Sequence, residues 1–228
     1  MLDAKQLLGE AKKITGLSFL GNPLFEQGFN KLVYSINNEA DLNDVGIQAQ
    51  HHRLIGILSN MLRIEDAVIN HPEILNEKIV APIVIVGLPR TGSTMTHRLL
   101  AADPRHTAML WWEGRYPAML PNEERGNPPE RMALGKAEVD AVVAASPEAL
   151  TIHPWDYKGA DEEILLLEHT FFSTVPESFM RLPSYSSWVE DQDHIHAYNQ
   201  LKIMLQYLQC DFVGMNRKST YIINLFNE

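Results

Sequence analysis

Apolar residues in the first third of the chain recur every three to four positions, which is the period of an amphipathic helix. Residues 1–35 predict one or two short helices, which Gly21-Asn22-Pro23 interrupts. A longer helix is predicted next, with its repeating face at Ile47, His51, Leu54, Ile55, Leu58, Met61 and Leu62. His71-Pro72 ends that pattern, because the residue before a proline disfavours helical geometry. We therefore expect an N-terminal helical extension over residues 1–78.

The period changes at Ile83-Val84-Ile85-Val86, a run of β-branched residues typical of a strand buried on both faces. Residues 87–92 have the composition of a loop, and helical spacing returns from Ser93 to Ala102, where Asp103-Pro104 ends it. Further helices are predicted at about 130–145, 147–151, 161–172 and 198–208. Tyr221-Ile222-Ile223 is compatible with a short strand, but no pattern connects it to the loop.

Composition narrows the classes of function. The formal net charge is −10, from 19 basic and 29 acidic residues, which argues against the broad basic footprint of nucleic-acid binding. Cys210 is the only cysteine, so no internal disulfide forms and a reducing, cytoplasmic location is expected. No secretory signal is visible, and the longest apolar run, Ile79 to Leu88, is about half of the ~20 residues of a membrane span.

The segment Gly87-Leu88-Pro89-Arg90-Thr91-Gly92-Ser93-Thr94 carries the candidate chemistry. Two glycines stand five positions apart, the spacing of a phosphate-binding loop, although this spacing alone also arises by chance. Its context adds weight, because the loop follows a strand and begins a helix, where backbone N–H groups and the helix dipole attract anions. The N–H groups of residues 91–94 are expected to point at the anion. The alternative is a strand–turn–helix in which the glycines only relieve turn strain.

One departure separates this loop from that of the nucleotide hydrolases. Ser93 stands where those enzymes have the lysine that reaches the terminal phosphates, so binding of a magnesium triphosphate is disfavoured. Arg90 inside the loop offers a fork of donors to a sulfuryl or phosphoryl oxygen. The loop therefore favours a smaller diphosphate-like anion with one transferable end.

The stretch IVIVGLPRTGSTMTHRLLAADP, residues 83–104, resembles the donor-binding segment of the bacterial-type sulfotransferases, whose loop is shared with the tyrosylprotein sulfotransferases. The similarity continues through LWWEGRYP at 110–117, GADEEILLLEHTF at 159–171, and the regions 185–188 and 198–209. It covers roughly residues 45–209. The resemblance implies an α/β, P-loop-like three-layer fold with a parallel sheet, placed in residues 79–228.

The same resemblance implies transfer of a sulfuryl group from 3′-phosphoadenylyl sulfate (PAPS) to a hydroxyl group of a small-molecule acceptor, without a metal. By it, the donor's 5′-phosphosulfate is held by Pro89, Arg90, Thr91, Gly92, Ser93 and Thr94. Arg90 stabilises charge on the bridging and sulfuryl oxygens, and Glu113 deprotonates the acceptor. The neighbouring Trp111 and Trp112 offer apolar surroundings that raise the pKa of such a base. The alternative for Glu113 is a solvated loop carboxylate.

Other polar residues are weaker candidates. Glu162, Glu163 and Glu168 flank the apolar run 164–167 and are expected on the solvated side of a helix, or one of them lines the acceptor pocket. His97 and Arg98 follow one turn into the loop helix and are expected as surface or supporting groups, and the alternative is direct contact with the donor. The nine histidines show no spacing typical of metal ligands.

The family pattern ends after Gln209. Members continue with a strand containing Lys-Ser-Pro, and then with an arginine and a serine that hold the donor's 3′-phosphate. Arg217, Lys218 and Ser219 do not match that arrangement. We therefore expect the C-terminal part of the sheet to be missing. Two alternatives stay open, a P-loop kinase-like phosphotransferase and an inactive fragment that keeps the fold as an interaction module.

Overall fold

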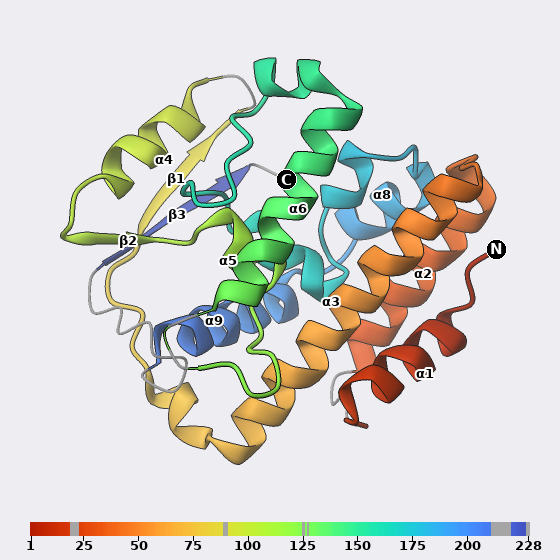
Figure 1. The fold of residues 1–228 in the computed structure, drawn as a ribbon, viewed down its shortest axis with the longest axis horizontal. Helices are drawn as coiled ribbons and strands as arrows, with labels where there is room; N and C mark the ends of the chain where they lie inside the picture. Colours follow the sequence, from red (N-terminus) through yellow and green to blue (C-terminus); the bar gives the residue numbers. More distant parts are fainter. Residues whose placement is uncertain (19–22, 89–90, 125, 127, 211–219, 227–228) are drawn as a thin grey trace. The chain divides into compact units, whose positions relative to one another are not determined.

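The computed structural model of the protein describes residues 1–18, 23–88, 91–124, 126, 128–210 and 220–226. Contacts divide the chain into two compact units (Figure 1). The helical unit comprises Met1–Glu73 and Leu166–Met204, and the sheet unit comprises Ile74–Leu165 and Leu205–Asn227. The domain boundary predicted from the sequence, between residues 78 and 79, stays a prediction.

The helices expected in the first third of the chain are confirmed. They are α1 (Ala4–Thr15), α2 (Pro23–Glu39) and α3 (Asp44–Asn70). Asp3 caps α1 by accepting from the N–H of Gln6 at 2.7 Å, and Asn43 caps α3 by accepting from Gly46 at 2.9 Å. The helical unit also contains η4 (Val175–Ser178), α8 (Pro183–Glu190) and the first ten residues of α9 (Ile195–Gln209). Local apolar spacing was therefore sufficient to predict α1, α2 and α3, whereas η4 and α8 were not predicted from the sequence.

The predicted helix over 161–172 forms only as α7 (Ile164–Leu167) and the single turn η3 (Glu168–Thr170). Phe171 ends it with a left-handed φ of 57°. At this point α2 comes very close, since a Cβ atom on Gly28 would lie 2.5 Å from the Phe171 carbonyl oxygen. Tertiary packing around Phe171 therefore overrides the helical period of the sequence.

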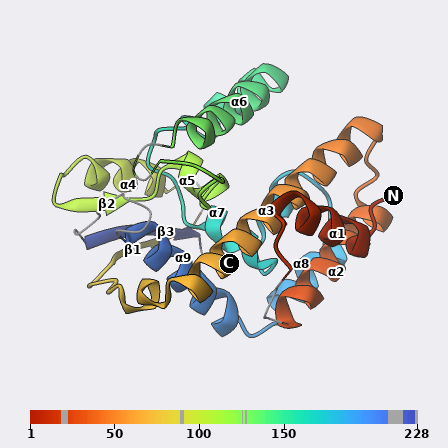
Figure 2. The ribbon, with the colours of Figure 1, turned by 60° about the horizontal axis from the view of Figure 1, so that its bottom comes forward.

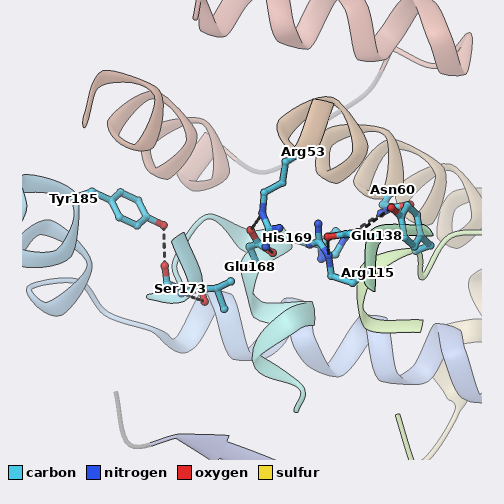
Figure 3. A network of polar contacts seen from close by, with 10 residues as sticks. Arg53, Asn60, Arg115, Glu138, Glu168, His169, Ser173 and Tyr185 are labelled. Atoms are coloured by element: carbon cyan, nitrogen blue, oxygen red, sulfur yellow. Dashed lines mark hydrogen bonds and ion pairs between the residues drawn. The ribbon is translucent and has the colours of Figure 1, made fainter. Parts of the chain in front are cut away.

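A buried polar network surrounds η3 in the helical unit, and Figure 3 shows its side chains. Arg53 donates to both carboxylate oxygens of Glu168, at 2.6 and 2.7 Å. Asn60 and His169 are joined by a hydrogen bond of 3.1 Å. The prediction that Glu168 is solvated is wrong, because its residue is only 2% exposed. A carboxylate buried to this degree needs a paired cation, which Arg53 provides.

The sheet unit contains three parallel strands, β1 (Ile83–Gly87), β2 (His106–Ala108) and β3 (Thr220–Phe226), in the order β1-β3-β2. Figure 1 shows β1 and β3 side by side, with Ile85 paired to Asn224. Residues 221–223 thus lie next to the strand that leads into the loop, a connection that the sequence did not indicate. The predicted mixed α/β fold with a parallel sheet is confirmed.

Strand β1 is less buried than its composition predicts. Val84 is 47% exposed and Val86 is 58% exposed, so the prediction of burial on both faces is wrong. Among the described strands β1 pairs with β3 alone, which leaves its other edge uncovered. Helix α4 (Ser93–Ala101) contacts all three strands and covers one face of this sheet (Figure 2).

The rest of the sheet unit is formed mainly by short helices and by α6. These elements are η1 (Pro72–Asn76, its first two residues in the helical unit), α5 (Trp111–Arg115), α6 (Pro129–Ala145) and η2 (Pro147–Thr151). Helix α6 packs tightly on α5, because a Cβ atom on Gly135 would lie 2.6 Å from the Trp112 Cβ atom.

Arg131 of α6 holds the loop that follows α5. Its guanidinium binds the Glu123 carboxylate, with Nε 2.8 Å from Oε2, and lies 5.0 Å from the centre of the Trp112 ring. It also donates to the carbonyl oxygens of Tyr116 and Pro117, at 2.9 and 3.1 Å. Arg131 is 1% exposed, so its charge depends on these partners.

Removing Arg131 is therefore expected to destabilise the fold strongly. Arg131→Met leaves the Glu123 carboxylate buried without its cation, which typically costs about 3–5 kcal/mol. Urea denaturation followed by tryptophan fluorescence measures the loss of unfolding free energy. The control is Lys136→Met on the same helix, where the ion pair to Asp140 is exposed and little change is expected. Equal effects of the two substitutions would contradict the role assigned to Arg131.

Candidate active site

The loop between β1 and α4 has the backbone geometry of a tight turn into a helix. Gly92 precedes the first helical residue with a φ of +89°, a conformation that a side chain would strain. A Cβ atom on Gly87 would lie 3.0 Å from the Thr91 hydroxyl oxygen. That hydroxyl donates to the Leu88 carbonyl at 2.7 Å and closes the turn. Pro89 and Arg90, two of the predicted donor-binding residues, lie outside the described residues.

The start of α4 is the predicted anion site. Within the part of the chain that the structure describes, no side chain caps this end of the helix. The first helical hydrogen bond runs from the N–H of Thr96 to the Gly92 carbonyl, at 3.0 Å. The preceding N–H groups have no acceptor inside the helix and carry the positive end of its dipole. The prediction of a strand followed by a helix that begins at Ser93 is confirmed, and anion binding there stays a prediction.

Thr94 links the loop to a buried carboxylate. Its hydroxyl donates to Oε1 of Glu162 at 3.4 Å, and Glu162 is 4% exposed. Burial, and to a smaller extent the neighbouring Asp161 charge, raise the pKa of Glu162 to about 7. The charge of His153 and the hydrogen bond from Thr94 act in the opposite direction. A carboxyl group with a pKa near neutrality beside the loop is suited to proton transfer.

Asp161 and His153 form the next layer of this cluster. Oδ2 of Asp161 lies 2.9 Å from Nε2 of His153, and Oδ1 accepts from the N–H of Glu162 at 2.8 Å. Burial alone lowers the pKa of His153, but the hydrogen bond and charge of Asp161, with the charge of Glu162, outweigh it. The net effect is a pKa of His153 above its ordinary value, so its ring holds a proton more readily.

Arg98 of α4 fixes the segment that carries these residues. Its guanidinium donates to the carbonyl oxygens of Pro154 and Ala160, at 2.8 and 3.3 Å. Gly159 makes the close approach possible, since a Cβ atom there would lie 2.8 Å from the guanidinium. Arg98 is thus a supporting group, one of the two alternatives that the sequence left open for it.

Glu113 lies in α5 and is fully buried. Its Oε2 accepts from the N–H of Leu110 at 2.8 Å and so caps the start of this short helix. Leu110 pairs with Ala160 in an isolated bridge, which places the start of α5 beside the segment that leads to Asp161. The alternative of a solvated loop carboxylate is wrong for Glu113. The role of Glu113 as the base that deprotonates the acceptor stays a prediction.

Two other polar side chains are buried where the sequence predicted exposure or left it open. Glu163 is fully buried, so all three glutamates predicted on a solvated helix side are buried instead. His97 is also fully buried, and its ring lies by the Ile222 backbone without a hydrogen bond of good geometry to any described residue. This burial lowers the pKa of His97. One signal for the glutamates was present, because four consecutive apolar residues at 164–167 leave no polar face.

No helix among the described residues is long and apolar enough to cross a membrane. No group of three or more histidine, cysteine, aspartate or glutamate side chains in the same ranges is arranged to hold a metal ion.

Comparison with known proteins identifies the fold and the family. The structure is similar to sulfotransferase STF9 from Mycobacterium avium, with a TM-score of 0.78 and 23% identity over 99% of this chain. It is also similar to sulfotransferase STF1 from Mycobacterium tuberculosis H37Rv, with a TM-score of 0.74 and 24% identity over 98% of this chain. The chain spans 57% and 61% of the lengths of those two proteins.

Sequence comparison agrees with the structural one. No curated protein matches the chain. The profile of the sulfotransferase family matches residues 82–223, a range that includes the loop, Glu113 and the cluster around Glu162. This match covers more than half of the protein. The chain belongs to the sulfotransferase family.

Proposed function

We propose that the protein transfers a sulfuryl group from PAPS to a hydroxyl group of a small-molecule acceptor. The observation that carries this proposal is the contact between Thr94, at the uncapped start of α4, and the buried carboxylate of Glu162. It brings an anion-binding helix start and a group suited to accept a proton into one place.

The donor would bind through its 5′-phosphosulfate. The N–H groups of residues 91–94 and the hydroxyl of Ser93 would hold the phosphosulfate oxygens, as at other helix starts that bind phosphate. The Thr94 hydroxyl has a single proton, so it would turn from Glu162 to these oxygens when the donor binds. Arg90 would add two charged hydrogen bonds to the bridging and sulfuryl oxygens. The uncapped helix start and the left-handed Gly92 fit such a group, since neither fills the space with a side chain.

The reaction has one bond-forming and one bond-breaking event at sulfur. The acceptor oxygen attacks the sulfur, the bond from sulfur to the bridging oxygen breaks, and adenosine 3′,5′-bisphosphate leaves. The acceptor's proton passes to a carboxylate of the enzyme. Glu113 and Glu162 are the two candidates for this base. Contact with Thr94 and a pKa of about 7 favour Glu162, whereas Oε2 of Glu113 is engaged by the Leu110 N–H.

Ser93 argues against the first rival, a kinase-like phosphotransferase, because a triphosphate lacks the lysine it needs there. The second rival is an interaction module without activity, and donor binding separates it from an enzyme. No 3′-phosphate role is proposed for Arg217, Lys218 and Ser219, which do not match the family's arrangement and lie outside the described residues.

The proposal is tested by isothermal titration of the protein with adenosine 3′,5′-bisphosphate, and by transfer of ³⁵S from labelled PAPS to a panel of phenols and alcohols. We expect Thr94→Val to weaken bisphosphate binding about tenfold or more, because a hydrogen bond to a charged group contributes about 1.5–3 kcal/mol. The matched control is Thr96→Val, whose hydroxyl is engaged by the Gly92 carbonyl at 3.2 Å.

Three results would count against the proposal. Folded protein that binds no bisphosphate would favour the interaction module. Magnesium-dependent ATP hydrolysis that disappears in a Gly92 variant would favour the kinase-like rival. Equal weakening by the Thr94 and Thr96 substitutions would place the bisphosphate away from the start of α4.

A further inference from the structure

We propose that His153 is a positioning residue that acts through Asp161 to set the orientation and the charge environment of Glu162 beside the loop. The inference rests on the proposed function where it treats Glu162 as the base in sulfuryl transfer. Its physical basis is independent of the substrate: a series of contacts joins Thr94, Glu162, Asp161 and His153, with the main-chain N–H of Glu162 as the link to Asp161.

The geometry fixes Asp161 at both of its oxygens. Oδ1 accepts from the N–H of Glu162 at 2.8 Å, while Oδ2 lies 2.9 Å from Nε2 of His153. Rotation of the Asp161 carboxylate would break one of these contacts. His153 therefore holds the group that orients the backbone at Glu162, and Glu162 in turn faces the Thr94 hydroxyl at 3.4 Å.

The ring of His153 is itself held in place. It packs edge-on against Trp155, with ring centres 5.5 Å apart, and Trp155 packs against Trp111 at 6.2 Å. The main chain next to it is tied to α4 by the hydrogen bond from Arg98 to Pro154. The side chain of His153 is 24% exposed, whereas the side chain of Asp161 is 5% exposed. The His153 ring can therefore exchange protons with solvent.

The charges around the cluster act in opposite directions on Glu162. The Asp161 carboxylate lies next to it in the chain and disfavours a second negative charge, whereas protonated His153 favours one. Two residues of α4 also take part. The Arg98 cation opposes protonation of His153, and the Asp161 charge favours protonation of the buried His97. Asp161 and His153 thus form a pair whose two members push the acidity of Glu162 in opposite directions.

This opposition gives a test that a purely structural role would not pass. ¹³C NMR of glutamate carboxyl carbons follows the titration directly, and the Glu162 signal is assigned by its loss in Glu162→Gln. We expect a midpoint near 7 in the unaltered protein. His153→Gln should raise that midpoint and Asp161→Asn should lower it, each by about one pH unit, the low end of the effect of a neighbouring charge.

The control is His196→Gln, an exposed histidine on α9, which should leave the midpoint unchanged. Shifts of the same sign in His153→Gln and Asp161→Asn, or no shift in His153→Gln, would overturn the inference. If Asp161→Asn does not fold, the comparison of His153→Gln with His196→Gln decides alone.

A second readout separates this inference from the proposed function. In an active enzyme the acid limb of kcat/KM should move with the same sign as the NMR midpoint in each variant. Opposite NMR shifts in a protein that binds no bisphosphate would uphold the pairing of His153 with Asp161 and reject the sulfotransferase proposal. Bisphosphate binding with an unmoved midpoint would reject the pairing alone.

Discussion

Glu162→Gln is expected to lower turnover by about 10²–10⁴ while it leaves the affinity for adenosine 3′,5′-bisphosphate nearly unchanged. The amide keeps the size of the side chain but cannot accept the acceptor's proton, and a lost general base typically costs a factor in this range. Affinity should persist because the donor's anionic end is proposed to bind at the start of α4 and Arg90. Steady-state kinetics with labelled PAPS and isothermal titration measure the two quantities.

The pH dependence of the unaltered enzyme provides a second measurement of the same base. A base with a pKa raised to about 7 is protonated, and inactive, below that pH. The rate should therefore rise with pH through about 7 and level off above it, and Glu162→Gln should lose this limb. Glu113→Gln is the competing variant, and it tests the role that the resemblance implied. Full activity in Glu162→Gln with a lost acid limb in Glu113→Gln would move the base to Glu113.

Arg90→Ala is expected to weaken donor binding and to slow transfer together, each by at least tenfold. A charged hydrogen bond contributes about 1.5–3 kcal/mol, and Arg90 is proposed to touch both the bound donor and the oxygens that gain charge during transfer. Arg90→Lys should recover only part of the loss, because an ammonium cannot form the paired contacts of a guanidinium. PAPS affinity and single-turnover rates measure the two effects.

The control for Arg90 is Arg105→Ala, a highly exposed arginine paired with Asp103, which should change neither quantity. Donor binding reduced equally in the Arg90 and Glu162 variants would contradict the assignment of one residue to the donor and the other to the acceptor. Unchanged PAPS affinity in Arg90→Ala would remove Arg90 from the donor site.

The amino-acid sequence alone was sufficient for the features that depend on neighbouring residues. The periods of α1, α2 and α3, and the switch from β-branched residues to helical spacing across Gly87 and Gly92, all arise within a few turns of chain. The loop that joins β1 to α4 was therefore predicted at its observed place. The resemblance to the sulfotransferases also rested mainly on this segment, and the family match over residues 82–223 confirms it.

Tertiary structure alone decided which partners surround the buried carboxylates and which strands pair. The apolar run at 164–167 signals that Glu162, Glu163 and Glu168 lack a solvated helix face, but partners far away in sequence determine how they are buried. For Glu168 the partner is Arg53, and for Glu162 it is Thr94. The pairing of β3 with β1 was hidden for the same reason, because the contact between Ile85 and Asn224 bridges most of the chain and no local period encodes it. A local pattern records the preferences of one segment, whereas burial and pKa depend on the segments that fold against it.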